Sequence, residues 1–198
     1  MKDETEAPTR GRGRPRDEEK DVAIAEATWR ILAEKGYEGL TFEGVAELAG
    51  CSRSTLYRRF AHKAELVEAI LGQTSRRIEP KIDETMSPRE ILLAHARALC
   101  VYMAGPRGPA MLMMSVSAEH HADLSAAIAR HGTNEQAFYL RELERARPGT
   151  SEQVRDFAFN TLIGNIIFHV AVLRTTLTER QIVRLVDGAL ALLEMEPG

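Results

Sequence analysis

Apolar side chains recur three and four residues apart along most of the chain, and this spacing predicts a protein built from helices. The first such segment spans residues 22–35 and ends at Gly36, which can take the left-handed conformation that closes a helix. The segments 88–103, 150–173 and 178–193 repeat the pattern. Aromatic content is only 6%, and most glycine and proline lies in apparent loops. We therefore expect an all-α fold.

Three predicted helices after residue 81 are preceded by a sequence signal for the start of a helix. Each signal combines a hydroxyl N-cap with a capping-box Glu or Gln three residues later. A short methionine-rich helix is expected over residues 110–116, and a long helix, with a break near Gly132, over residues 117–145. The predicted capping pairs are Ser87 with Glu90, Thr150 with Gln153, and Thr178 with Gln181.

Residues 40–63 predict two short helices joined by a tight turn. Thr41 offers a hydroxyl N-cap to the first helix, and Ser52 offers one to the second. Gly50 lies between them and can adopt the positive φ that a tight turn requires. In the second helix, Leu56 shares a face with the aromatic residue four positions later, so we expect both to turn inward.

The outward face of this second helix carries cations, hydroxyl groups and one phenol, and the helix contains no carboxylate. A helix that reads base edges in the major groove of DNA needs such a set of donors and acceptors. The outward residues are Arg53, Ser54, Thr55, Tyr57, Arg58 and Arg59.

This stretch resembles the DNA-binding domain of the tetracycline-repressor (TetR) family. The resemblance covers residues 17–73 and rests on a Thr-x-x-x-Val-Ala start, an Ala-Gly turn and a Leu-Tyr-x-x-Phe-x-x-Lys ending. Gly44 departs from a good helical sequence, at a cost of about 1 kcal/mol relative to alanine. The resemblance implies a three-helix helix-turn-helix head over residues 17–77. It also implies a helical ligand-binding and dimerisation domain over residues 81–198, with roughly nine helices in all.

The same resemblance implies contacts with a double-stranded DNA operator. In the family, a lysine at the position of Lys63 contacts a phosphate, and the N-terminus of the helix that it opens favours an anion. The alternative is an ordinary surface lysine. The predicted DNA-binding residues are Thr41, Ser52, Arg53, Ser54, Thr55, Tyr57, Arg58 and Lys63.

A separate basic segment precedes the predicted head. Residues 10–16 hold four arginines and no acid, with a Gly-Arg-Pro core that resembles an AT-hook. We expect a flexible arm over residues 1–16 that places Arg12, Arg14 and Arg16 in a narrow A·T minor groove, where the negative potential is enhanced. The alternative is a solvated tail that adds only non-specific affinity.

The last two predicted helices are unusually apolar, and each contains a glycine. Two such helices from each of two copies would form a four-helix interface, and a pseudo-palindromic operator requires two heads. We therefore expect a homodimer, against the alternative of a purely intrachain core. The predicted interface residues are Phe157, Leu162, Gly164, Ile166, Val170, Leu185, Ala189 and Leu192.

The domain over residues 81–198 is also expected to hold a small apolar effector. Methionine is flexible and polarisable, which suits a loosely fitting ligand, although a methionine cluster is more often plain core. The candidate pocket residues are Leu99, Tyr102, Met103, Met113, Met114 and Phe138.

Composition narrows the class of protein. The formal net charge of −3 gives no general affinity for nucleic acid, so the position of each charge matters more than the sum. The polar start of the chain lacks a secretory segment, and no apolar run approaches the ~20 residues that span a bilayer. We expect a cytoplasmic protein without a membrane partner, in which Cys51 and Cys100 stay reduced.

No motif of an enzyme or a metal site is present. The sequence lacks a Gly-rich phosphate loop, Gly-x-Ser-x-Gly and Cys-x-x-Cys. His120 and His121 are adjacent and point to different faces of a helix, which argues against a chelating pair. No catalytic residue, metal or cofactor is therefore expected.

Together these patterns predict a dimeric DNA-binding transcriptional regulator, and more specifically a repressor that its effector releases from DNA. Two other classes remain open. One is an all-α ligand carrier or enzyme with a vestigial head, and the other is a nucleoid-type DNA binder of low specificity.

Overall fold

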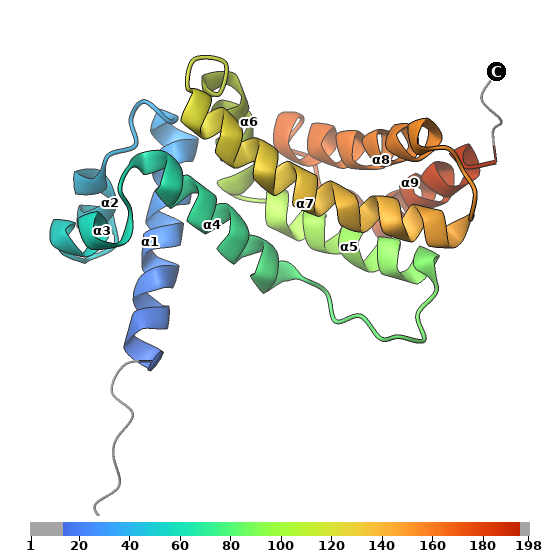
Figure 1. The fold of residues 1–198 in the computed structure, drawn as a ribbon, viewed down its shortest axis with the longest axis horizontal. Helices are drawn as coiled ribbons and strands as arrows, with labels where there is room; N and C mark the ends of the chain where they lie inside the picture. The colour runs from blue at the N-terminus through green and yellow to red at the C-terminus, as the bar shows by residue number, and fades with distance from the viewer. Residues whose placement is uncertain (1–13, 195–198) are drawn as a thin grey trace, which may run out of the picture.

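The computed structural model describes residues 14–194, apart from the side chains of residues 14–17 and 74–78. All regular structure in this range is helical, so the predicted all-α class is confirmed. Figure 1 shows α2 and α3 at one end of the molecule and α8 and α9 towards the other, with α4 running between the two halves. The elements are α1 (Arg14–Lys35), α2 (Phe42–Leu48), α3 (Arg53–Arg59), α4 (Lys63–Ile78), α5 (Pro88–Met103), α6 (Arg107–Ser117), α7 (Ala122–Ala146), α8 (Glu152–Ile167), the π-helical turn η1 (Phe168–Val172) and α9 (Glu179–Leu192).

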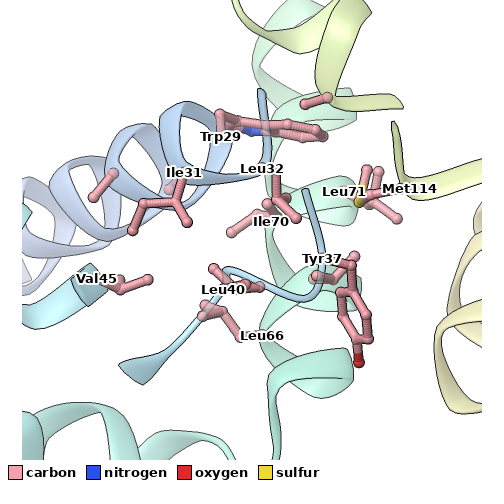
Figure 2. Packing of buried hydrophobic residues seen from close by; sticks show 14 of the residues in the cluster. Trp29, Ile31, Leu32, Tyr37, Leu40, Val45, Leu66, Ile70, Leu71 and Met114 are labelled. Atoms are coloured by element: carbon pink, nitrogen blue, oxygen red, sulfur yellow. The ribbon is translucent and has the colours of Figure 1, made fainter. Parts of the chain in front are cut away.

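The first four helices pack around one apolar centre. α2 and α3 have seven residues each, too few for an isolated helix to be stable in water, so tertiary packing must hold them. Val45 of α2 and Leu56 of α3 are fully buried against α1 and α4. Figure 2 shows Val45 near Leu40, with Leu32 of α1 and Leu66 of α4 lining the same centre.

This apolar centre continues into the second half of the chain. α1 packs on α6 and α4 packs on α7, and Met114 of α6 lies beside Leu71 of α4 in Figure 2. Trp29 of α1 is 2% exposed, and its ring meets that of Tyr102 of α5 edge-on, with the centroids 6.1 Å apart. Trp29 therefore packs against the second half of the chain as well as within the head. The head and the second half share one core.

A second apolar core lies between α5, α7, α8 and α9. Leu92, Leu162 and Val186 are each at most 1% exposed and fill its centre. Glu142 of α7 is buried beside them, and its carboxylate accepts a hydrogen bond from Arg145 at 2.6 Å. A buried carboxylate without such a partner would be costly, so this ion pair makes the acid tolerable at the edge of the core.

Local chemistry explains how two helices of the second half begin. α5 and α9 both open with a reciprocal capping box, in which the N-cap hydroxyl and the side chain three residues later each satisfy a free amide. These two predictions are confirmed. The pairs are Ser87 with Glu90 and Thr178 with Gln181.

The third predicted capping box is absent. The hydroxyl of Thr150 donates to the carbonyl of Arg147 at 2.8 Å, so it does not cap α8. Ser151 is the N-cap instead, and its hydroxyl oxygen accepts a hydrogen bond from the amide of Val154 at 3.4 Å. The helix therefore begins one residue later than the sequence indicated.

Other helix boundaries also differ from those predicted. α1 begins at Arg14 rather than near residue 22, because Pro15 in its first turn needs no amide partner and the acids that follow suit a helix N-terminus. α7 passes through Gly132 without a break, since packing along α4 and α5 outweighs the roughly 1 kcal/mol that one glycine costs. The break lies at residues 118–121, before α7.

Candidate nucleic-acid interface and ligand cavity

The turn between α2 and α3 is held by local hydrogen bonds. The Thr41 hydroxyl accepts from the amide of Gly44 at 3.1 Å, and the Ser52 hydroxyl accepts from the amide of Thr55 at 3.3 Å, so each short helix has its predicted N-cap. Gly50 has a φ of +64°, a conformation that a side chain would strain. These contacts fix the direction in which α3 leaves the turn.

The outward face of α3 is a polar ridge, which we define as residues 52–58. Leu56 is fully buried beneath it, whereas Tyr57 is 58% exposed and the Arg53 side chain is 69% exposed. Ser54 and Arg58 are also exposed, and Thr55 is half-buried. In Figure 1 this helix lies at the outer end of the molecule, away from α5–α9. The ridge can therefore be reached by a large partner.

One carboxylate borders the ridge, although α3 itself has none. Glu43 of α2 accepts a hydrogen bond from the Tyr57 hydroxyl at 3.3 Å, and it lies 3.7 Å from the Arg53 guanidinium. The rings of Phe42 and Tyr57 meet edge-on at 4.9 Å, and this contact brings α2 against the ridge. Sequence reasoning missed Glu43 because its role depends on how the two helices pack.

Arg59 does not belong to the ridge. Its guanidinium forms an ion pair with Asp21 of α1, and its side chain is only 25% exposed. The expectation that Arg59 faces outward is therefore wrong. With 3.6 residues per turn, this position of α3 faces α1, and the ion pair of Arg59 links the two helices.

Lys63, at the start of α4, already has intrachain partners. Its ammonium donates to the carbonyl of Tyr37 at 2.9 Å and lies 4.0 Å from the centre of the Tyr37 ring. The Tyr37 hydroxyl in turn donates to Asp123 of α7 at 3.4 Å. Burial, with Asp123 as a second cause, raises the pKa of Tyr37 well above its usual range. Lys63 thus lies at the junction between the head and the second half.

The basic arm is only partly within the described residues. Arg12 lies outside them. Arg14 and Arg16 lie in the first turns of α1, so the backbone there is helical rather than extended. The predicted flexible arm over residues 1–16 therefore does not extend over Arg14 and Arg16, and the minor-groove contacts of the three arginines stay a prediction.

A cavity of about 460 Å³ lies in the second half, lined by α5, α6, α7 and α8. Its size is within the range of small-molecule sites. Four of the six predicted pocket residues line it, namely Leu99, Tyr102, Met103 and Phe138.

Met113 and Met114 are not part of this wall. Met114 is fully buried in the core shared with the head, and Met113 is exposed. The neighbouring positions Met111 and Leu112 face the cavity instead. The sequence indicated an apolar helix here but gave the wrong rotation about its axis.

Polar groups interrupt the apolar wall of the cavity. His95 stacks on Phe138 with the ring centres 3.9 Å apart, and burial lowers the pKa of His95 to about 4, so the ring is neutral at pH 7. Burial raises the pKa of both Tyr102 and Tyr139 above the usual range. The His95 Nε2 atom and the Tyr102 hydroxyl are buried without a hydrogen-bond partner in the described structure. Unsatisfied groups of this kind are costly unless something else supplies a partner.

α4 links the cavity to the head. It begins at Lys63, and Glu79 and Pro80, which follow its last residue, line the cavity. Between these ends, Glu68 accepts two hydrogen bonds from Arg130 of α7, at 2.9 and 2.6 Å. These contacts place α4 between the cavity, α7 and the head.

The last two helices are apolar on two faces. Leu162, Ile166 and Ala189 are at most 1% exposed, so these three predicted interface residues belong to the intrachain core. Phe157 is 62% exposed, and a Cβ added to Gly164 would meet no atom within 4 Å, so these two lie on the outer face. The remaining predicted residues, Val170, Leu185 and Leu192, are half-buried.

The outer apolar face extends beyond the predicted set. Phe168 and Val172 of η1, with Leu173 after it, are between 48% and 50% exposed. A Cβ on Gly188 of α9 would also meet nothing within 4 Å. Three large apolar side chains are thus exposed within residues 168–173.

None of the helices over residues 14–194 combines the length and the apolar character needed to cross a bilayer. No group of three or more potential metal ligands was found among the described side chains.

Residues 24–70 match the family model for "Bacterial regulatory proteins, tetR family". The DNA-binding transcriptional repressor TetR of Mycobacteroides abscessus is 31% identical over 117 residues, which is 59% of this chain and 61% of that protein. The HTH-type transcriptional regulator YdeS of Bacillus subtilis is 32% identical over 98 residues, or 49% of this chain and 48% of that one. The chain therefore spans about half to three fifths of the length of these curated relatives.

A solved structure extends the similarity to the second half. The crystal structure of a TetR family transcription regulator from Marinobacter aquaeolei aligns over 91% of this chain and 98% of that one. The TM-score is 0.67 at 22% sequence identity. The two proteins share a fold along nearly their whole length, and at this identity the likeness shows the fold alone.

Proposed function

Because the chain belongs to the TetR family of bacterial regulatory proteins, we propose that it is a sequence-specific DNA-binding transcriptional regulator that acts in the cytoplasm. The observation that carries this proposal is the ridge of α3, where Arg53 and Tyr57 stand exposed above a fully buried Leu56. A short helix with this set of donors and acceptors matches what the major groove requires.

The predicted DNA-binding residues divide into two roles. Arg53, together with Ser54 or Thr55, meets base edges and so reads sequence. Thr41, Tyr57 and Lys63 meet phosphates and so fix the register, because contacts with phosphate carry no sequence information. The remaining two predicted residues are Ser52, which orients the hydroxyls beside it through contacts of 2.9 Å, and Arg58, which is exposed and able to serve either role.

The functional form is a homodimer on a pseudo-palindromic operator. The outer apolar face of α8, η1 and α9 supports this proposal, because it leaves Phe157 and Phe168 in contact with solvent in one chain. The two heads must then lie one helical turn of DNA apart, ~34 Å or somewhat more. Sedimentation should show a dimer at micromolar concentration, and a monomer would exclude this arrangement.

The cavity holds an effector that releases the repressor from DNA. An effector that favours a state with the wrong spacing between heads shifts the population away from the DNA-binding state. The link through α4 and the Glu68–Arg130 pair supports this coupling. A coupling free energy of about 1–3 kcal/mol would change operator affinity roughly 5- to 150-fold.

The test is selection of bound duplexes from a random pool, followed by affinity measurements with variants. Arg53→Ala should lose about 1–3 kcal/mol at one base position and relax the preference there. Tyr57→Phe should weaken binding to all duplexes alike. Arg30→Ala is the matched control, because Arg30 is exposed on α1 and pairs with Glu34 of the same helix. A pool that yields no enriched sequence, or an Arg53 variant with unchanged preference, would refute the proposed function.

A further inference from the structure

The head and the second half meet at a small cluster of polar side chains beside residues 36–40. His121, which lies just before α7, pairs through Nε2 with the carboxylate of Glu38. Its ring also meets the ring of Tyr37 edge-on, with the centres 4.9 Å apart. Tyr37 is fully buried, and the His121 side chain is only 28% exposed. A histidine largely shielded from water therefore joins the head to the second half.

Lys63 brings a permanent positive charge to the same tyrosine. Its ammonium lies 4.0 Å from the centre of the Tyr37 ring, and the Tyr37 hydroxyl donates to Asp123 of α7 at 3.4 Å. Two side chains that share one ring as a neighbour are separated by no more than a Debye length, ~8–10 Å, so each feels the charge of the other. The cluster thus contains Lys63, the carboxylates of Glu38 and Asp123, and a histidine whose charge depends on pH.

Other groups near this cluster are an apolar side chain, a second histidine and a helix end. α6 faces residues 36–40 with Met113, whose terminal methyl group would lie 3.3 Å from a Cβ on Gly36. His120 is exposed, and its charge acts on Glu38 more weakly than His121 does. His121 is the N-cap residue of α7, where the positive end of the helix dipole disfavours a cation.

The charge of His121 therefore depends on opposing influences. Lys63 and the N-terminus of α7 disfavour the protonated ring, whereas the carboxylates of Glu38 and Asp123 favour it. The hydrogen bond from His121 is the main cause that lowers the pKa of Glu38, so this carboxylate is ionised at neutral pH and can pair with a charged ring. A change in the position of Lys63 alters this balance.

A DNA phosphate at Lys63 would shift the balance in one direction. The phosphate brings negative charge to the cluster, which favours a cation beside it. An ammonium drawn toward the phosphate also leaves the face of the Tyr37 ring, so the repulsion between Lys63 and a charged His121 decreases. Both changes favour the protonated ring.

We propose that DNA binding by this protein is coupled to proton uptake at His121, whose ring takes one proton from the solvent and pairs with Glu38 as a cation. The inference rests on the proposed function, because it takes Lys63 as a phosphate contact. Histidine changes its charge between about pH 5 and 8. The complex binds the extra proton more tightly than the free protein, so DNA affinity should be highest at the acid end of this range. It should fall as the pH rises, by up to about tenfold per pH unit for each chain bound.

The test measures the protons taken up when the full chain binds DNA. A pool of random-sequence duplexes is the probe, because a phosphate contact carries no sequence information. Titration calorimetry at pH 7, in buffers that differ in their enthalpy of ionisation, gives the number of protons taken up. We expect an uptake of between about 0.3 and 1 proton per chain. Binding without any uptake would overturn the proposal.

Histidine variants assign the proton to one ring. His121→Gln keeps a hydrogen-bonding group beside Glu38, and it should abolish most of the uptake and flatten the dependence of DNA affinity on pH. His120→Gln removes the adjacent, exposed histidine and is the matched control, which should leave the uptake unchanged. His62 is the N-cap residue of α4, next to Lys63, and provides a second comparison. An uptake that survives His121→Gln and disappears in His62→Gln would assign the proton elsewhere and refute the proposal.

A lysine variant tests the cause of the uptake. Lys63→Gln lacks the ammonium before DNA binds, so the His121 ring is more readily protonated in the free variant. The variant should therefore take up roughly half as many protons on binding, or fewer. Low salt in all titrations offsets the weaker binding of the variant. An uptake equal to that of the unaltered protein would show that Lys63 is not the link between DNA and His121.

Failure of the inference can be told apart from failure of the proposed function. A chain that binds the duplexes without taking up a proton keeps the proposed function and loses this coupling. A chain that binds no duplex at any pH between about 5 and 8 loses both.

Discussion

The ridge of α3 and the cavity use polar side chains in opposite ways. On the ridge, Arg53 and Tyr57 are exposed to water and make weak contacts with Glu43. A partner can replace these contacts at a small cost in free energy. In the cavity, His95 and Tyr102 hold buried polar atoms that have no hydrogen-bond partner among the described residues. The comparison shows that the ridge is ready for a charged, hydrated partner, whereas the cavity gains most from a ligand that replaces missing contacts.

The largest effect should come from the core that connects these two regions. Leu71→Ala removes a fully buried side chain between α4 and α6 and should cost about 2–5 kcal/mol of the free energy of unfolding. Urea unfolding followed by circular dichroism and by Trp29 fluorescence should show one coincident transition, because the core beneath the ridge also contains Tyr102 and Met103 of the cavity wall. Leu48→Ala is the control, since Leu48 is 44% exposed. Two separate transitions would mean that the regions fold independently.

The next effect concerns the cavity and depends on pH. Burial lowers the pKa of His95 in the folded state to about 4, below its unfolded value, so the unfolded chain binds the extra proton first as the pH falls. The contribution of His95 to stability is therefore present above about pH 6.5 and is lost as the pH falls toward 4. The free energy of unfolding should be measured by chemical unfolding at each pH. Over this window it should fall by about 1–2 kcal/mol more in the unaltered protein than in the His95→Gln variant. If the free energy of unfolding falls by the same amount in both proteins, the His95 ring is in contact with water.

A smaller effect is expected at the edge of the ridge. Glu43→Gln removes the carboxylate beside Arg53 and should strengthen binding to random duplexes by about 0.5–1 kcal/mol, because phosphates no longer approach a like charge. The slope of log K against log salt should become steeper by up to about 1. Glu47→Gln on the same helix removes the same charge one turn away and serves as the control. Identical changes in both variants would show that Glu43 acts only through net charge.

The smallest effect tests the connection between the two regions. Glu68→Gln breaks the exposed pair with Arg130 and should change the free energy of unfolding very little, because water screens an exposed ion pair. It should nevertheless reduce the change in DNA affinity that a bound ligand causes, since this pair joins α4 to α7. Asp187→Asn is the control, because its pair with Arg89 is also bidentate and exposed but joins α5 to α9. A loss of coupling in both variants would exclude a special role for α4.

The head could be predicted from sequence because its determinants are local. The caps at Thr41 and Ser52 and the turn at Gly50 each depend on residues within a few positions of one another, and the structure has all three. The orientation of Arg59 and the place of Glu43 could not be predicted, since both depend on packing between helices.

The cavity could be predicted only in part for the same reason. Its wall comes from helices far apart in the sequence, and a rotation of α6 about its axis exchanges Met113 for Leu112 without changing the apolar pattern. The split of α8 between an inner and an outer apolar face was also invisible, because both faces carry apolar residues. The π-helical turn η1 left no signal in the sequence.

Lys63 has a consequence for how strongly the head can hold DNA. A phosphate that draws the Lys63 ammonium away from the carbonyl and the ring of Tyr37 would remove these two contacts from the junction. The operator phosphate would then compete with the carbonyl and the ring of Tyr37 for the Lys63 ammonium. The contact between the head and the second half would be weaker in the DNA complex than in the free protein. Amide hydrogens around residues 36–40 should accordingly exchange faster in the DNA complex, the reverse of the protection that binding usually confers.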